Sequence, residues 1–343
     1  MRRLALVGLL LGAAIVLLLV LPLHMGHAVP QLDRWWQTAD AIGVRGYLWR
    51  HAWQMFLDHP WLGAGFDAFA FTLIGQLQTG NEVSRWGIDQ FAHNLLLQLL
   101  ACGGLAGALA WLLPGAALVR RQCALAWTPG RLWGWGLAGV LLIHSLLEQP
   151  LYFAYFLGVI ALLLGMLDVT GQGISISLRR RSLAILLLPG LLLLVKTASD
   201  YEQLASWFYG TRDLSRAGQM AERHEIARQL HDRSLFTAHI ELASPGDFVP
   251  ENAPDAEKIA FNLRVMHFAP VAEIEFRHAA LLVQAHRVAD AKVQFRRAAY
   301  AYPDQAREYL RRISALATND SATWGELAAY GKVLLASMPA AFK

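Results

Sequence analysis

Charged residues are scarce in this chain, and lysine does not occur before Lys196. Only 16% of the 343 residues are charged, whereas 55% are apolar, a balance that excludes an ordinary soluble pair of domains. The two cysteines, Cys102 in an apolar run and Cys123 in a basic loop, predict no disulfide framework. The pI near 9.2 reflects arginines placed beside apolar runs, so no nucleic-acid partner is expected.

The apolar residues gather in long runs, which predict membrane helices. Leu4–Leu23 is an uninterrupted apolar stretch of the length needed to cross a hydrocarbon core of ~30 Å. Further spans are predicted at Leu95–Val119, Leu132–Leu147, Leu151–Leu167 and Ser182–Val195. The sequence therefore predicts an all-α fold, a polytopic membrane helix bundle of about five spans.

Arginine placement predicts the orientation of this bundle. Three clusters of basic residues beside the apolar runs fall on one side of five spans, which the positive-inside rule makes cytoplasmic: Arg2 and Arg3, then Arg120, Arg121 and Arg131, then Arg179–Arg181. We therefore expect a multi-pass membrane protein with a cytoplasmic N-terminus and an outward-facing C-terminal domain. The first run could instead be a secretory signal cleaved near Gly26–Ala28, although its apolar core is long for that.

Four regions follow from this topology: a first membrane helix at 1–23, an outward-facing loop at 24–92, membrane helices two to five at 93–197, and an outward-facing helical domain at 198–343. The loop is rich in tryptophan, as interfacial segments are. Within it, Gly46–Phe56 predicts a short interfacial helix with Leu48, Ala52, Met55 and Phe56 on one face, ended by Pro60. In the second span, Gly103, Gly104 and Gly107 predict close helix packing.

The last region changes character, because charges become frequent and apolar residues take helical spacing. Phe276–Arg287 and Val288–Tyr302 predict a helix–turn–helix closed by Pro303. This pattern is typical of one tetratricopeptide-type unit, and a plain helical hairpin fits it equally well.

His93 and Asn94 stand at the outward start of the second span, where a membrane enzyme would meet a lipid-linked substrate. Asp89 is the expected N-cap. The partial positive charge of the helix end should lower the histidine pKa, leave a neutral general base, and attract phosphate. The alternative is an interfacial histidine hydrogen-bonded to the loop.

Two more clusters could contribute to a site. Arg45 and Arg50 could bind phosphate oxygens through their planar guanidinium groups, or could simply reach towards lipid headgroups. His144 and Glu148, four residues apart, are predicted on one face of the third span, as part of a site or as a structural clamp. The trio His51, Asp58 and His59 matches no zinc spacing, so no metal or cofactor is expected.

Taken in order, these motifs resemble the C-terminal half of a superfamily of bacterial O-antigen ligases, O-antigen polymerases and protein O-oligosaccharyltransferases. The resemblance rests on Arg45–Trp49, Ala52–Met55, Asp58–Gly65, His93–Asn94 and His144–Leu151 followed by Tyr155–Gly158. The His144–Leu151 stretch and the helical tail are most similar to the protein-glycosylating branch.

The resemblance implies a glycosyltransferase that moves a preassembled oligosaccharide from undecaprenyl pyrophosphate to an acceptor hydroxyl without a metal. It also implies the bacterial inner membrane as the location, so that the outward-facing loop at 24–92 and the C-terminal domain would be periplasmic. Arg45 would hold the pyrophosphate, His93 would act as base, and Arg50, Asn94, His144 and Glu148 would line the substrate cavity. The expected acceptor is a pilin-like protein, with the lipid A core as the next choice and polymerisation of glycan repeats as a third reading. Because superfamily members carry more spans, we expect an N-terminally incomplete member or one half of a split enzyme. The alternative is a non-catalytic membrane scaffold whose tail binds a partner.

Overall fold

The computed structural model describes residues 39–80, 82–84, 86–167, 180–209, 217–243, 248–249 and 252–339. Every regular element in these ranges is helical, with no strand among them, which confirms the all-α prediction. The predicted first span Leu4–Leu23, with the arginines before it and the alternative signal cleavage site, lies outside the described residues, as does Arg179.

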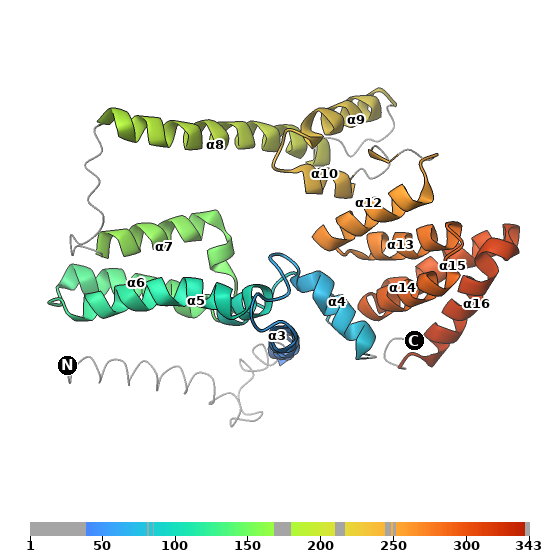
Figure 1. Ribbon diagram of the computed structural model, residues 1–343, viewed down its shortest axis with the longest axis horizontal. Helices are drawn as coiled ribbons and strands as arrows, with labels where there is room; N and C mark the ends of the chain where they lie inside the picture. The colour runs from blue at the N-terminus through green and yellow to red at the C-terminus, as the bar shows by residue number, and fades with distance from the viewer. Residues whose placement is uncertain are drawn as a thin grey trace, which may run out of the picture. The chain divides into compact units, whose positions relative to one another are not determined.

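The helices are shown in chain order in Figure 1. They are α3 (Ala39–Asp58), α4 (Phe69–Thr79), α5 (Leu95–Cys123), α6 (Pro129–His144), the 3₁₀ turn η1 (Pro150–Tyr152), α7 (Ala154–Leu167), α8 (Arg180–Tyr209), α9 (Ala217–His231), α10 (Thr237–Ala243), α12 (Asp255–Phe268), α13 (Ala272–Gln284), α14 (Val288–Ala301), α15 (Pro303–Asn319) and α16 (Ser321–Ser337). Two compact units are distinguished, residues 1–50 and 51–343.

Among the described helices, only α5 is long and apolar enough to cross a membrane. The predicted third and fourth spans are helices but shorter than expected: α6 has 16 residues and ends at His144, and α7 has 14. The fifth predicted span forms the first part of α8, a 30-residue helix that runs on through Pro189 into charged sequence. The count of five spans therefore stays a prediction.

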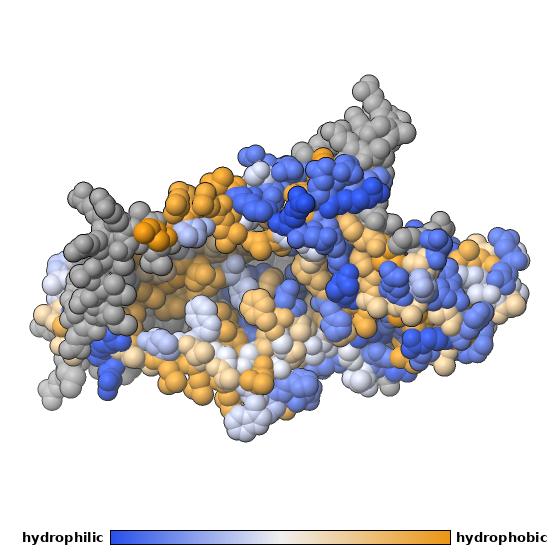
Figure 2. Space-filling model, turned by 45° about the horizontal axis from the view of Figure 1, so that its top comes forward, coloured by the Kyte–Doolittle hydropathy of each residue, from blue (hydrophilic) through white to orange (hydrophobic). Residues whose placement is uncertain are grey.

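The shorter apolar helices pack against each other. In α6 and α7, Ala138 and Ile160 share a buried cluster with Leu151 of the connecting turn, and Gly134 lies against Leu167. Their other faces carry exposed leucines and aromatic residues, as do those of α5 and α8. Figure 2 shows hydrophobic residues gathered over one part of the face in view, and hydrophilic residues mixed with hydrophobic ones over the rest of the coloured surface.

The interfacial helix predicted at Gly46–Phe56 lies inside α3, which is longer at both ends. Its predicted apolar face is formed, because Leu48, Ala52 and Met55 are buried and Phe56 is half-buried. The predicted face is therefore buried, and the location of the helix at a bilayer interface stays a prediction.

The C-terminal helices form two successive hairpins, α13 with α14 and α15 with α16, around one core. The predicted hairpin is thus confirmed, and Pro303 begins the helix that follows it. Phe276 and Phe295 meet edge to face in this core, with ring centroids 5.3 Å apart. A second hairpin shares the core, so the region contains more than the single unit suggested by the sequence.

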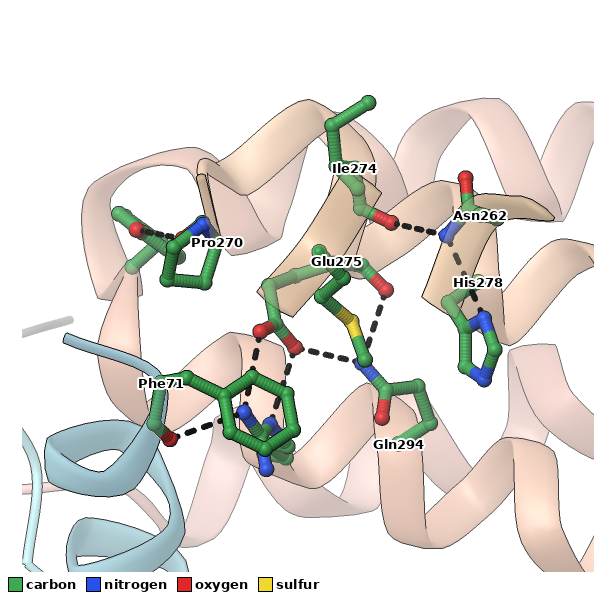
Figure 3. A network of polar contacts seen from close by, with 10 residues as sticks. Phe71, Asn262, Pro270, Ile274, Glu275, His278 and Gln294 are labelled. Atoms are coloured by element: carbon green, nitrogen blue, oxygen red, sulfur yellow. Dashed lines mark hydrogen bonds and ion pairs between the residues drawn. The ribbon is translucent and has the colours of Figure 1, made fainter. Parts of the chain in front are cut away.

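A buried ion pair joins this tail to α4. Glu275 is fully buried and accepts a hydrogen bond from Arg297 (3.1 Å to Nε). It also accepts one from Gln294 (2.6 Å), whose amide points at the Glu275 side chain in Figure 3. Arg297 also donates to the backbone carbonyl of Phe71 in α4 (3.2 Å) and lies over its ring. The guanidinium therefore connects the tail to the segment that leads towards His93.

Candidate functional site

His93 lies just before α5, held between two carboxylates. Its Nδ1 is 2.7 Å from Oε2 of Glu148, and its Nε2 is 2.9 Å from Oδ2 of Asp89. The imidazole is 21% exposed, whereas the Asp89 and Glu148 side chains are 39% and 38% exposed. The three side chains therefore form an acidic cluster around a histidine (the His93 cluster) that is open to the surroundings.

The backbone around His93 is fixed by the start of α5. His93 has a positive φ of 50°, and the next residue, Asn94, is the N-cap. The Asn94 Oδ1 accepts a hydrogen bond from the Leu97 N–H (3.0 Å), and its Nδ2 donates to the Leu146 carbonyl (2.9 Å). Asn94 thus fixes both the helix start and the turn that carries Glu148, while its predicted contact with substrate stays a prediction.

The prediction that Asp89 caps the helix is wrong, because Asn94 takes that position and Asp89 pairs with His93 instead. The helix end is also less open to anions than expected. The Leu95 N–H donates to the Ser145 carbonyl (2.7 Å) and the Leu97 N–H to Asn94. These N–H groups would otherwise be the donors that attract a phosphate.

The prediction of a lowered histidine pKa is also wrong. Burial by itself lowers the pKa of His93, but the hydrogen bonds and negative charges of Asp89 and Glu148 together outweigh burial and raise it above its usual value. The sequence argument considered the helix end alone and missed the second carboxylate. In the described structure, both ring nitrogens of His93 face carboxylate oxygens.

His144 and Glu148 do not share a helix face, contrary to the prediction. Helix α6 ends at His144, and Glu148 lies in the turn that follows, with its N–H donating to the His144 carbonyl (2.9 Å). The Glu148 side chain turns to His93, 55 residues earlier in the chain, and His144 is exposed. A role for His144 in lining the substrate cavity stays a prediction.

The predicted arginines belong to the unit that ends at Arg50, whereas His93 belongs to the other. Arg45 is half-buried on α3, and Arg50 is exposed with its guanidinium carbon 5.8 Å from the centre of the Tyr47 ring. Their proposed contact with pyrophosphate therefore stays a prediction.

Behind His93, a polar layer that the sequence did not point to supports its loop. The Ala92 N–H donates to Oε1 of Gln98 (2.7 Å), and Gln98 is buried in the second turn of α5. The Phe91 ring packs on Tyr152 of the η1 turn, with centroids 4.7 Å apart. Gln98 could have been noticed as the one polar residue in the first turns of an apolar helix.

No group of three His, Cys, Asp or Glu side chains that could hold a metal occurs among the described residues. What the His93 cluster can do is accept and pass on a proton. A histidine oriented by one carboxylate through Nδ1 can use Nε2 as a base when the other carboxylate releases it.

Comparison with known proteins places this geometry in context. A family model described as virulence factor membrane-bound polymerase, C-terminal, matches residues 132–314, which is more than half of the chain. A second, described as O-antigen ligase, matches residues 1–112. A general O-oligosaccharyltransferase from Acinetobacter baylyi is 29% identical over 167 residues, covering 43% of this chain and 27% of that protein. No solved structure matches the chain significantly.

Proposed function

Because the chain belongs to the virulence factor membrane-bound polymerase family and carries an O-antigen ligase match, we propose that it is a membrane glycosyltransferase. Its donor would be an oligosaccharide on undecaprenyl pyrophosphate, and its acceptor a hydroxyl group. The observation that carries the proposal is the pairing of His93 with Glu148. It joins the loop before α5 to the turn after α6 and gives the histidine a fixed orientation.

The reaction would proceed by attack of the acceptor oxygen on the anomeric carbon. The hydroxyl proton would pass to Nε2 of His93 while the bond from the anomeric carbon to the pyrophosphate oxygen breaks, and the pyrophosphate would leave with the electron pair. In the described structure, Oδ2 of Asp89 lies 2.9 Å from Nε2 of His93. Asp89 must therefore move away from Nε2 as the acceptor arrives. Its exposed side chain is suited to such a movement.

A pyrophosphate leaving group needs neutralisation of its charge more than it needs a strong acid. We assign this role to Arg45, with Arg50 as a further donor, since guanidinium groups bind phosphate oxygens in pairs of hydrogen bonds. Asn94 and His144 complete the proposed substrate-binding residues, and Glu148 orients His93. We place the site at the periplasmic face of the bacterial inner membrane, where the lipid-linked donor is presented.

A protein Ser or Thr is the acceptor that we favour, with the lipid A core next. Support comes from the similarity to a general O-oligosaccharyltransferase. The paired helices of the tail would offer a protein acceptor a surface to bind, as helical repeats do. The matched region covers 27% of that relative, so the acceptor of the whole relative comes to this chain only as a proposal.

The test is expression of the chain with a pilin-like acceptor in cells that make the lipid-linked donor and lack their own transferase. We expect a rise in acceptor mass equal to the glycan, and its loss in His93→Ala with membrane insertion unchanged. A longer glycan chain with no change in acceptor mass would indicate a polymerase instead. An unchanged mass shift in His93→Ala would contradict the role of the histidine.

A second candidate function, a membrane scaffold, is favoured by a pocket of about 420 Å³ on the tail. Lys292, Arg296, Glu326 and Tyr330 line it together with Gln78, so it offers both charges and an aromatic ring to a partner. Lys292→Glu, made in the 343-residue chain, reverses one charge of this pocket and separates the two functions. A scaffold would lose its partner in a pull-down, whereas the transferase would retain glycan transfer to the lipid A core.

A further inference from the structure

Helix α5 is interrupted at Gly104, which has φ 60° and ψ −159°. In an unbroken α-helix, the N–H of Leu105 would bond to the Ala101 carbonyl and that of Ala106 to the Cys102 carbonyl. Neither bond forms here, because all four groups are paired with another segment of the chain. The break therefore leaves two N–H groups and two carbonyls for that segment to bind.

The segment Pro60–Gly65 satisfies all four groups. Its Pro60 and Trp61 carbonyls accept from the two freed N–H groups, at 2.8 and 3.1 Å. Its Ala64 and Gly65 N–H groups donate to the two freed carbonyls, at 2.8 and 3.1 Å. The loop thus replaces the missing helical hydrogen bonds by backbone pairing from outside the helix.

The two backbones approach so closely that only glycine fits at the crossing. A Cβ on Gly63, whose φ is 70°, would lie 2.3 Å from the Cys102 carbonyl carbon. A Cβ on Gly104 would lie 2.5 Å from the carbonyl carbon of Trp61. Gly104 was predicted from sequence to serve helix packing in general, and the structure shows which segment it receives.

The position of the break along α5 sets the depth of the loop. Gly104 comes nine residues after Leu95, the first residue of α5, so the crossing lies about 13 Å along the helix at ~1.5 Å per residue. A hydrocarbon core is ~30 Å thick, and the run from Leu95 to Val119 contains no charged residue. The loop is therefore level with the apolar interior of the span.

The side chains of this loop are apolar and strongly exposed. Trp61 is 73%, Leu62 76% and Phe66 94% exposed, although their backbone is firmly docked. Directly after the break, α5 itself exposes Leu105 and Leu109. An apolar surface that continues from a membrane helix onto a loop at the same depth fits lipid rather than water.

We propose that Pro60–Phe66 is a re-entrant loop that enters the bilayer beside α5, with Trp61, Leu62 and Phe66 in contact with lipid hydrocarbon. Irregular backbone at membrane depth is tolerated where protein satisfies its polar groups, and the break at Gly104 does this. The proposal concerns the membrane insertion of the chain and does not depend on its reaction.

Spin labelling tests the proposal in the full chain reconstituted into liposomes. Phe66→Cys is labelled with a nitroxide in a background of Cys102→Ala and Cys123→Ser, which leaves the backbone pairing intact. Accessibility to oxygen, which concentrates in lipid, is compared with accessibility to a water-soluble nickel chelate. Leu113→Cys in α5 and Leu235→Cys in the turn after α9 are matched controls, since both native side chains are exposed.

The proposal predicts that residue 66 behaves like residue 113, with high oxygen and low nickel accessibility, and that residue 235 shows the reverse. Nickel accessibility at residue 66 equal to that at residue 235 would place the loop in water and overturn the proposal. Protection of residue 66 from both reagents would show that protein covers it, which also overturns it. Leu62→Cys repeats the measurement on liposomes purified by flotation, so that only inserted protein is compared.

Discussion

Two histidines in this chain each lie between two carboxylates, in different surroundings. His93 contacts Asp89 and Glu148, whereas His231 is 2.6 Å from Asp232 through Nδ1 and 2.9 Å from Glu241 through Nε2. The two imidazoles are almost equally buried, at 21% and 20% exposure. The residue types and distances are therefore alike. What differs is how far the carboxylates around each ring are exposed.

In the tail, the carboxylate that faces Nε2 of His231 is enclosed by protein. Glu241 is 7% exposed and also accepts hydrogen bonds from Nε (3.2 Å) and Nη2 (2.8 Å) of Arg264. Burial raises the pKa of Glu241, but the hydrogen bonds and charges of Arg264 and His231 lower it below its usual value. His231 also stacks on Phe248, with ring centroids 4.2 Å apart. This arrangement is a structural clamp.

Near α5, both carboxylates around His93 stay accessible. Glu148 is 38% exposed and Asp89 39%, and the pKa of His93 is raised. The comparison teaches that a histidine between acids is a candidate site when the acids can still be reached by a substrate. The enclosed cluster serves as an internal control for the open one.

The largest expected effect separates the two histidines by activity. His93→Ala should lower glycan transfer about 10²–10⁴-fold, the usual contribution of a positioned base. His231→Ala should retain transfer, because its cluster contacts no substrate in our account. Initial rates with a purified lipid-linked donor measure both, at equal amounts of inserted protein. Equal losses in the two variants would remove the distinction.

Stability should separate the clusters in the opposite sense. Arg264→Ala leaves the buried Glu241 with fewer donors and is expected to cost about 1–3 kcal/mol. Asp89→Asn removes a partly exposed ion pair and should cost less than about 1 kcal/mol. Thermal unfolding in detergent compares the two, and a larger shift of the midpoint for Asp89→Asn would contradict our reading.

A smaller effect is expected at the N-cap that positions His93. Asn94→Ala should lower the stability of the α5 start by about 1 kcal/mol, because the Leu97 N–H loses its acceptor. Asn94→Ser is the matched control, since serine also caps helices but cannot reach Leu146 as the amide does. Hydrogen exchange of the Leu97 amide distinguishes the variants: protection should fall in Asn94→Ala and return largely in Asn94→Ser. Unchanged protection in Asn94→Ala would mean that the cap is not needed.

Local patterns in the sequence predicted what depends on neighbouring residues. The helix around Gly46–Phe56, the hairpin before Pro303 and an apolar helix from Leu95 were all expected and are present. The family resemblance, inferred from motifs of a few residues each, was confirmed by the family matches. These features need only periodicity, turn residues and short spacing.

Features that depend on distant contacts could not be predicted in this way. Nothing local to Glu148 indicates a partner 55 residues earlier, so the sequence paired it with His144 on a helix that in fact ends there. The pKa of His93 was expected to fall because only the helix end was considered. The break at Gly104 was missed. A glycine on which another backbone segment packs looks the same in the sequence as a glycine that lets two helices pack closely.

The pH dependence of transfer by the Glu148→Gln variant tests the central claim most directly. A protonated His93 cannot accept a proton, so transfer by the native chain should rise with pH through a His93 pKa above its usual value. Glu148→Gln removes a negative neighbour, lowers that pKa, and should move the rise to lower pH, while Glu241→Gln should leave it in place. A profile that does not move in Glu148→Gln, or that moves equally in both variants, would contradict the assignment of His93 as the base.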